Sequence, residues 1–191
     1  LYANSSMDAR YDDSNIYSID YDINNIGDAY KNLNLQYYYS DVDHPMDTKY
    51  RVSGATSYRT ARLQTSMQGV KMKNSFDLFG SKLLAGVDLS RRTWDGYRYD
   101  TNVTTGVQSS FSTMISPTQT DNSAIFAKLE KSFGGVALEG GVRYDMTDID
   151  TDNATSKDRE FNALGANVLA TYSLDKQNKV FAGVGTASRV P

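Results

Sequence analysis

The sequence lacks several features that would assign it to a common class. It has no cysteine, so it has no disulfide framework and gives no clue to its redox compartment. Proline occurs only three times, and no run approaches the roughly 18 apolar residues of a membrane-spanning helix. The net charge is −3, which argues against a nucleic-acid partner, because such partners favour a basic patch.

The arrangements typical of enzymes are also missing. The one histidine, His44, has no evident nucleophile to activate, and there is no glycine-rich phosphate loop. Asp43 and Asp47 would need a cleft to act as paired catalytic carboxylates, and nothing in the sequence indicates one. The acidic segment 148–158 lacks the glycine and terminal glutamate of a calcium-binding EF-hand, which predicts a solvated loop. We therefore expect the protein not to be an enzyme.

Alternation of apolar and polar residues is what the sequence does contain. In 31–42, for example, Leu33 and Leu35 alternate with Asn34 and Gln36. This period of two predicts β-strands, and long helical periodicity is hard to find. The predicted strands cover residues 15–23, 31–42, 58–70, 82–93, 123–133, 136–147, 161–174 and 179–189.

The connections between these strands alternate in length. Three are short ("NNIGDA", "GG" and "DKQN"), 71–81 is intermediate, and 43–57, 94–121 and 148–160 are long and polar. Short periplasmic turns and long external loops are typical of outer-membrane barrels. We therefore predict an all-β fold, an antiparallel transmembrane β-barrel segment of about eight strands. A soluble antiparallel barrel with an apolar interior fits the same alternation, because the period does not say which face meets water.

In the membrane interpretation, the aliphatic and tyrosine face of each strand meets lipid and the polar face lines an enclosed lumen. Aromatic residues near strand ends, such as Tyr17, Tyr39 and Tyr172, suit the membrane interface. Met67 lies on the apolar face of the segment 58–70, and we expect it to face lipid.

His44 and Met46 are the candidate metal ligands. With the short turns in the periplasm, the strand 31–42 runs outward, and "SDVDHPMD" opens an external loop. Two residues apart on an extended segment, the two side chains point to the same side. Thioether sulfur is a soft ligand that selects Cu(I), and imidazole also suits copper. Taken alone, a His-x-Met pair in a loop is more often accidental than not, since two ligands do not complete a metal site.

Four stretches resemble a known family. "GGVRYD" (140–145) and "VFAGVGTASRVP" (180–191) resemble barrel segments of TonB-dependent outer-membrane receptors, in which Ser-Arg-x-Pro recurs on a mid-barrel strand. More narrowly, "SSMDARYDDS" (5–14) and "YYYSDVDHPMD" (37–47) resemble the TonB-dependent copper receptors. The broad resemblance covers nearly the whole chain, and the narrow one rests on about twenty residues.

The resemblance implies a fold and a function. Such receptors are 22-stranded barrels of the bacterial outer membrane that are closed by an N-terminal plug, and they import a scarce solute with energy passed on by TonB. Residues 1–191 would be part of the barrel domain, without the plug and the remaining strands. In the copper subfamily the His-x-Met pair supplies two copper ligands, here His44 and Met46, and a Cys-x-x-x-Met in the plug supplies the others. Met7 matches the subfamily pattern without an assigned role.

Two alternatives stay open at this point. A receptor of the same architecture could take an iron-siderophore or cobalamin, and His44 and Met46 would then be incidental. The chain could instead be a complete small barrel with a structural or adhesive role. Small barrels fill their interior with side chains, and the many inward Asn, Gln and Ser residues favour a wider lumen.

Overall fold

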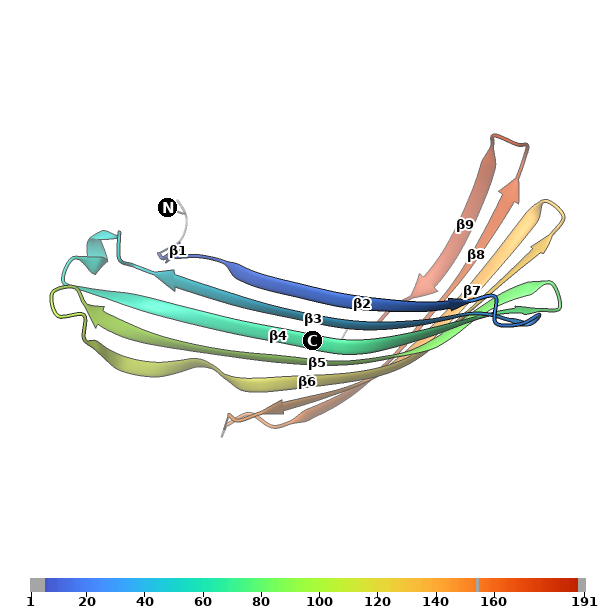
Figure 1. Ribbon diagram of the computed structural model, residues 1–191. Coiled ribbons are helices and arrows are strands. Elements are labelled where there is room, and N and C mark those ends of the chain that lie inside the picture. The colour runs from blue at the N-terminus through green and yellow to red at the C-terminus, as the bar shows by residue number, and fades with distance from the viewer. Residues whose placement is uncertain (1–5, 154, 189–191) are drawn as a thin grey trace.

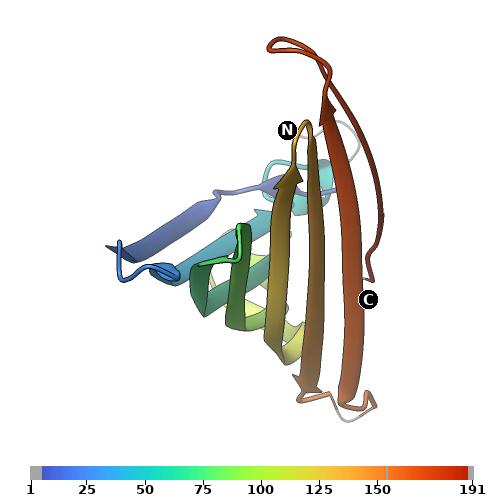
Figure 2. The ribbon, with the colours of Figure 1, turned by 90° about the vertical axis from the view of Figure 1, so that its right-hand side faces the viewer.

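The computed structural model describes residues 6–153 and 155–188, which form one antiparallel sheet. Figure 1 shows the strands as a single curved layer, and Figure 2 shows how this layer bends from β2 round to β9. These residues include no helix long and apolar enough to cross a membrane, a test that does not address strands. The strands are β1 (Asp8–Ala9), β2 (Asp13–Asn24), β3 (Tyr30–Asp47), β4 (Ser57–Leu78), β5 (Ser81–Asn102), β6 (Gln108–Phe133), β7 (Val136–Thr151), β8 (Arg159–Ser173) and β9 (Lys179–Thr186).

The sheet confirms the predicted all-β antiparallel class. Its order is β1-β3-β4-β5-β6-β7-β8-β9, and β2 also pairs with β3, on the same edge as β1. Each of the eight predicted ranges overlaps a different strand from β2 to β9, and the last residue of the range 179–189 lies outside the described residues. Only the two-residue β1 was not predicted.

The strands are longer than the alternation indicated. The segment 94–121 was predicted to be a long loop, but it is strand apart from residues 103–107. Likewise, 71–81 reduces to a turn at 79–80 between β4 and β5. Strand extensions therefore take up most of 94–121 and the ends of 43–57 and 148–160 at one end of the sheet, and the tight turns lie at the other end (Figure 1).

The turn between β4 and β5 offers a stability test. Phe79 has φ 51° and Gly80 φ 74°, the left-handed values of a type I′ hairpin, in which Asn-Gly is preferred. Phe79 is 98% exposed, so replacing it loses no packing. We expect Phe79→Asn to raise the free energy of unfolding by about 1 kcal/mol, because asparagine adopts positive φ more readily than phenylalanine. Urea unfolding would measure the gain, and Phe79→Ala is the control without it; equal midpoints for Asn and Ala would contradict the prediction.

The strand register gathers the apolar residues on one face. A row of directly paired residues crosses seven strands and contains only tyrosine and apolar side chains. The row is Tyr21, Leu35, Met72, Val87, Ile125, Tyr144 and Leu164. The adjacent row on the opposite face is Asp20, Gln36, Lys71, Asp88, Ala124, Asp145 and Ala163. The two rows show that one face of the sheet is apolar and the other polar across seven neighbouring strands, and not only along single strands.

Contacts that skip a strand identify the polar face as the inner, concave one. Tyr38 on β3 donates to Asp88 on β5 across β4, with Oη 3.4 Å from Oδ1. Arg143 on β7 donates to Asp88 across β6, with Nη1 3.4 Å from Oδ2. Side chains converge on the inside of a bend and diverge on its outside. The apolar row therefore points outward. We call this row, together with the apolar residues that lie beside it on the same face of the same strands, the outer belt.

Beyond the outer belt the alternation changes phase. On β4, Val70 and Met72 point outward, whereas Ala61 and Leu63 point inward, and Ala61 is only 7% exposed. An apolar outer face suits contact with lipid, and a polar outer face suits contact with water. Where the outer face becomes polar, β3, β4 and β5 extend beyond the outer belt, and we call these extensions (residues 40–47, 57–68 and 90–102) the rim.

The phase change corrects the prediction for Met67. The side chain was expected on the lipid-facing side, but the register places it on the inner face, the face of Lys71. There Arg92 on β5 donates to it, with Nη2 3.9 Å from Sδ. The prediction was wrong because it took the apolar side of this strand to face lipid throughout, whereas in the rim the apolar side is the inner one.

Candidate functional site

His44 and Met46 lie on strand β3, near its end in the rim. The prediction of an external loop from residue 43 was wrong, because β3 continues through Asp47 and pairs with β4 throughout this stretch. His44 pairs with Leu63 and Met46 with Ala61, and the register puts both side chains on the inner face. Both are half-buried. An imidazole and a thioether therefore share one side of one strand, facing the space that the sheet encloses.

A bulge stands directly opposite His44. Ala9 of β1 pairs with Met46, and Asp13 of β2 pairs with Asp43. Three residues, 10–12, therefore face two residues of β3, and the Arg10 amide donates to the carbonyl of Pro45 at 2.8 Å. Bulges of this kind re-aim side chains.

Asp12, at the end of this bulge, contacts the histidine. Its Oδ1 meets Nδ1 of His44, and the His44 side chain keeps 31% of its surface exposed. The imidazole is thus held at one nitrogen, and part of the ring still faces solvent.

The outer side of the bulge is held by a second set of contacts. Tyr11 Oη donates to Asp43 Oδ2 at 3.1 Å, and Arg62 Nε donates to Asp43 Oδ1 at 2.8 Å. Arg62 also donates to the hydroxyl of Tyr97 at 3.3 Å. The hydrogen bonds from Arg62 hold the pKa of the Asp43 carboxyl below its ordinary value. The bulge is therefore connected through Asp43 to β4 and β5.

Arg59 and Asp100 form another ion pair in the rim, and it predicts how the stability of the β4–β5 hairpin depends on pH. Arg59 donates from Nε to Oδ1 at 2.9 Å and from Nη2 to Oδ2 at 3.2 Å, which lowers the pKa of Asp100. A carboxyl whose pKa is lower in the folded state stabilises it above the unfolded pKa of about 4, and this stabilisation is lost as the pH falls through the lowered pKa. We expect Arg59→Gln to reduce amide protection of the β4–β5 hairpin above about pH 4, and to do so less below it. Hydrogen exchange against pH measures this, and identical profiles for the two proteins would contradict it.

Metal-binding geometry at the rim is incomplete by itself. Within residues 6–153 and 155–188, no group of three or more His, Cys, Asp or Glu side chains is arranged to hold a metal ion. Met7 lies two residues before Ala9, the pairing partner of Met46. The rim thus offers one imidazole and a thioether beside it, and metal binding by His44 and Met46 stays a prediction.

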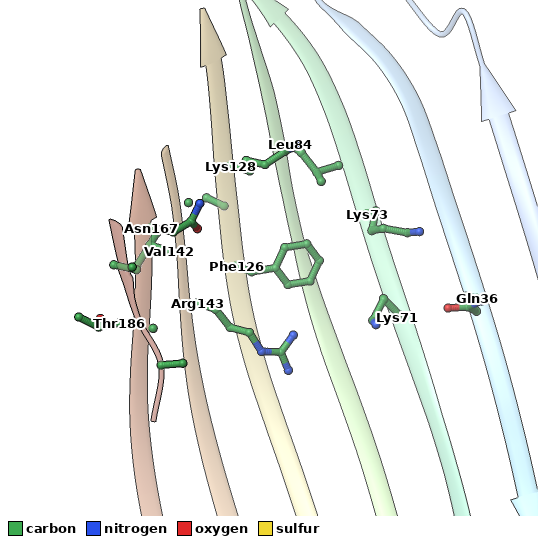
Figure 3. A pocket seen from close by; sticks show the side chains of 16 residues that line it. Gln36, Lys71, Lys73, Leu84, Phe126, Lys128, Val142, Arg143, Asn167 and Thr186 are labelled. Carbon is green, nitrogen blue, oxygen red and sulfur yellow. The ribbon is translucent and has the colours of Figure 1, made fainter. Parts of the chain in front are cut away.

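Below the rim, the inner face carries an open hollow of about 730 Å³. Figure 3 shows Lys71, Lys73, Lys128 and Arg143 around it, with Phe126 in the middle. Most of these cations have carboxylate partners, so the wall is polar but largely charge-balanced. The ion pairs are Lys71–Asp88 at 3.2 Å, Lys128–Glu130 at 2.5 Å, Lys128–Glu139 at 3.4 Å and Arg143–Asp145 at 2.8 Å.

Sequence reasoning missed this hollow and the bulge. Lysine, arginine and carboxylate residues at alternate positions of successive strands were the available signal for a polar wall. Which of them lie at the same height depends on the strand register.

Comparison with known proteins gives a family match over nearly the whole chain. The model described as "TonB dependent receptor-like, beta-barrel" matches residues 2–191. No curated protein matches the sequence.

Several solved structures have the same fold. The copper transporter OprC is 19% identical at a TM-score of 0.85, over 100% of this chain and 32% of that protein. The ferric-catecholate import receptor Fiu from Escherichia coli K12, in its open form, is 15% identical at 0.69, over 94% and 36%. BauA, the ferric preacinetobactin receptor from Acinetobacter baumannii, is 14% identical at 0.61, over 90% and 29%. The chain therefore spans about a third of the length of these receptors.

Proposed function

The chain belongs to the TonB-dependent receptor β-barrel family of the Gram-negative outer membrane, and from this premise we propose that it serves to bind and import copper. The family consists of transporters, which agrees with the expectation that the protein is not an enzyme. The outer belt suits a wall that faces lipid, and the polar inner face suits a lumen.

We propose further that the chain forms part of the wall of a 22-stranded barrel. In the described residues, β9 pairs only with β8 and β2 only with β3. Unpaired backbone at two sheet edges is costly in lipid, and further strands that close the barrel would satisfy it. An N-terminal plug and its engagement with TonB complete the proposal.

The observation that carries the choice of copper is the shared side of His44 and Met46. One imidazole and one thioether face the lumen side of the rim, where a solute from outside would arrive first. Thioether sulfur favours Cu(I) over harder cations such as Fe³⁺. A structure with the same fold is named a copper transporter, which adds support to the choice.

A ferric-siderophore receptor is the second candidate. Two structures with the same fold are named a ferric-catecholate import receptor and a ferric preacinetobactin receptor, and the cations of the hollow would attract an anionic iron chelate. The carboxylates paired with Lys71, Lys128 and Arg143 weaken that attraction. In this case His44 and Met46 would be incidental.

A binding comparison on the full-length receptor separates the two candidates. The receptor, purified in detergent, is incubated with Cu(I) under reducing conditions or with a ferric tris-catecholate, and the bound metal is measured after gel filtration. We expect copper near one equivalent and no retained iron. Retained iron without copper would support the siderophore alternative and overturn the copper proposal.

A further inference from the structure

We propose that Asp12 is a positioning residue for the metal ligand His44, an inference that rests on the proposed copper function. In this role the Asp12 carboxylate accepts the Nδ1 proton of the imidazole and leaves the Nε2 lone pair directed at the incoming ion. The contact between Asp12 Oδ1 and His44 Nδ1 is the observation behind it.

The bulge is what makes this contact possible. Counting back from the Ala9–Met46 pair without an extra residue would set Tyr11 opposite His44, and would set Asp12 opposite Asp43 on the outer face. The extra residue shifts the register by one, so that Asp13 pairs with Asp43 and Asp12 reaches the inner face.

The displaced Tyr11 stabilises this arrangement. On the outer face its hydroxyl donates to Asp43, which also accepts hydrogen bonds from Arg62 on β4. The bulge is thereby fixed on the outer side by Tyr11 and on the inner side by Asp12. A flexible segment would not hold a carboxylate against one ring nitrogen.

The chemistry of the contact suits a metal ligand. A neutral imidazole carries its proton on one nitrogen and can coordinate through the other, and the hydrogen bond at the first selects which. Losing a carboxylate partner at that position typically lowers the metal affinity of such a histidine 10–100-fold. The part of the His44 ring that stays exposed leaves room for coordination.

The test compares three variants of the full-length receptor. We expect Asp12→Ala to weaken Cu(I) binding by about 10–100-fold in a competition titration with a Cu(I) chelator. Asp12→Asn keeps an acceptor oxygen and should restore most of the affinity. Asp13→Ala, the neighbouring residue on the outer face, should leave the affinity unchanged.

A spectroscopic readout separates positioning from a general structural effect. In ¹⁵N-histidine NMR of the metal-free receptor, with the signal assigned through its loss in His44→Gln, we expect the proton on Nδ1 in the wild type. The Asp12→Ala variant should show a mixture of tautomers. An unchanged tautomer and affinity in Asp12→Ala would overturn the proposal. If this variant fails to fold, the same two measurements on Asp12→Gln, whose longer chain displaces the acceptor, decide in its place.

Failure of the copper function looks different. A wild-type receptor that binds no Cu(I) would refute the proposed function, while its histidine tautomer would still report the Asp12 contact. Copper binding that survives the loss of His44 would refute His44 as a ligand, and with it the positioning role of Asp12. Copper binding that needs His44 but not Asp12 would refute only the positioning role.

Discussion

Replacing His44 and Met46 together by alanine is expected to weaken Cu(I) binding by the full-length receptor by about 100-fold or more, a loss of about 2.7 kcal/mol. Both side chains lie on the inner face of β3, two residues apart, so one ion can contact both. Their removal takes away one imidazole and one thioether, the ligand types that suit copper. Competition with a Cu(I) chelator measures the affinity, and copper accumulation in cells measures uptake.

Met67→Ala is the matched control for this experiment. Met67 also lies on the inner face, but Arg92 donates to its sulfur, and a guanidinium at that distance repels a metal cation. Removing this thioether should leave copper affinity unchanged. If the double variant binds copper as tightly as the wild type, the rim is not the copper site, although membership of the receptor family is unaffected.

The strands themselves could be predicted because alternation is a local property. The outward face of a strand needs an apolar residue at every second position. The sequence shows this pattern directly on β5, at Leu83, Ala85, Val87 and Leu89. Strand ends could not be predicted in the same way. Beyond the outer belt both faces of a strand are polar, and a polar strand extension resembles a loop in the sequence.

The candidate site was predictable only in part. The shared side of His44 and Met46 follows from their spacing on any extended segment, and the paired strand β3 preserves it. Asp12 was beyond reach, because its direction depends on a single extra residue between β1 and β2. Nothing in "ARYDDS" marks which residue is inserted, and without the register either Tyr11 or Asp12 could face the histidine.

Met67 shows that the face of a residue also could not be predicted from the alternation of its own strand. The alternation in 58–70 is real, but it reports the face that packs inside the rim. The outward apolar face begins at Val70, where the phase has already changed. A single strand does not reveal this reversal, whereas the neighbouring Leu89, paired with Val70, identifies it at once.

The orientation of the sheet gives the second large prediction. Val168→Arg is expected to destabilise the full-length receptor by about 2–4 kcal/mol, because it places a guanidinium on the lipid face, in the middle of the outward apolar stretch of β8 between Leu164 and Tyr172. Val168 is 57% exposed and pairs with Gly140 and Val184 within the outer belt. Urea unfolding of the receptor from lipid vesicles, followed by tryptophan fluorescence, measures the loss.

Asn167→Arg is the control one residue away. Asn167 faces the hollow on the inner side and pairs with Gly141 and Gly185, so a longer side chain has room and remains in contact with water (Figure 3). We expect its unfolding midpoint to stay close to that of the wild type. A soluble barrel with an apolar interior predicts the same ranking, because Val168 would then lie in a closed core and Asn167 on a wet surface. The two arrangements differ in the medium they need: a soluble barrel would keep its fold in detergent-free buffer, whereas a barrel with Val168 on its lipid face needs vesicles or detergent. Equal destabilisation by both variants would contradict each arrangement, because neither face would then be wet, and the lumen that His44 and Met46 are proposed to face would not exist.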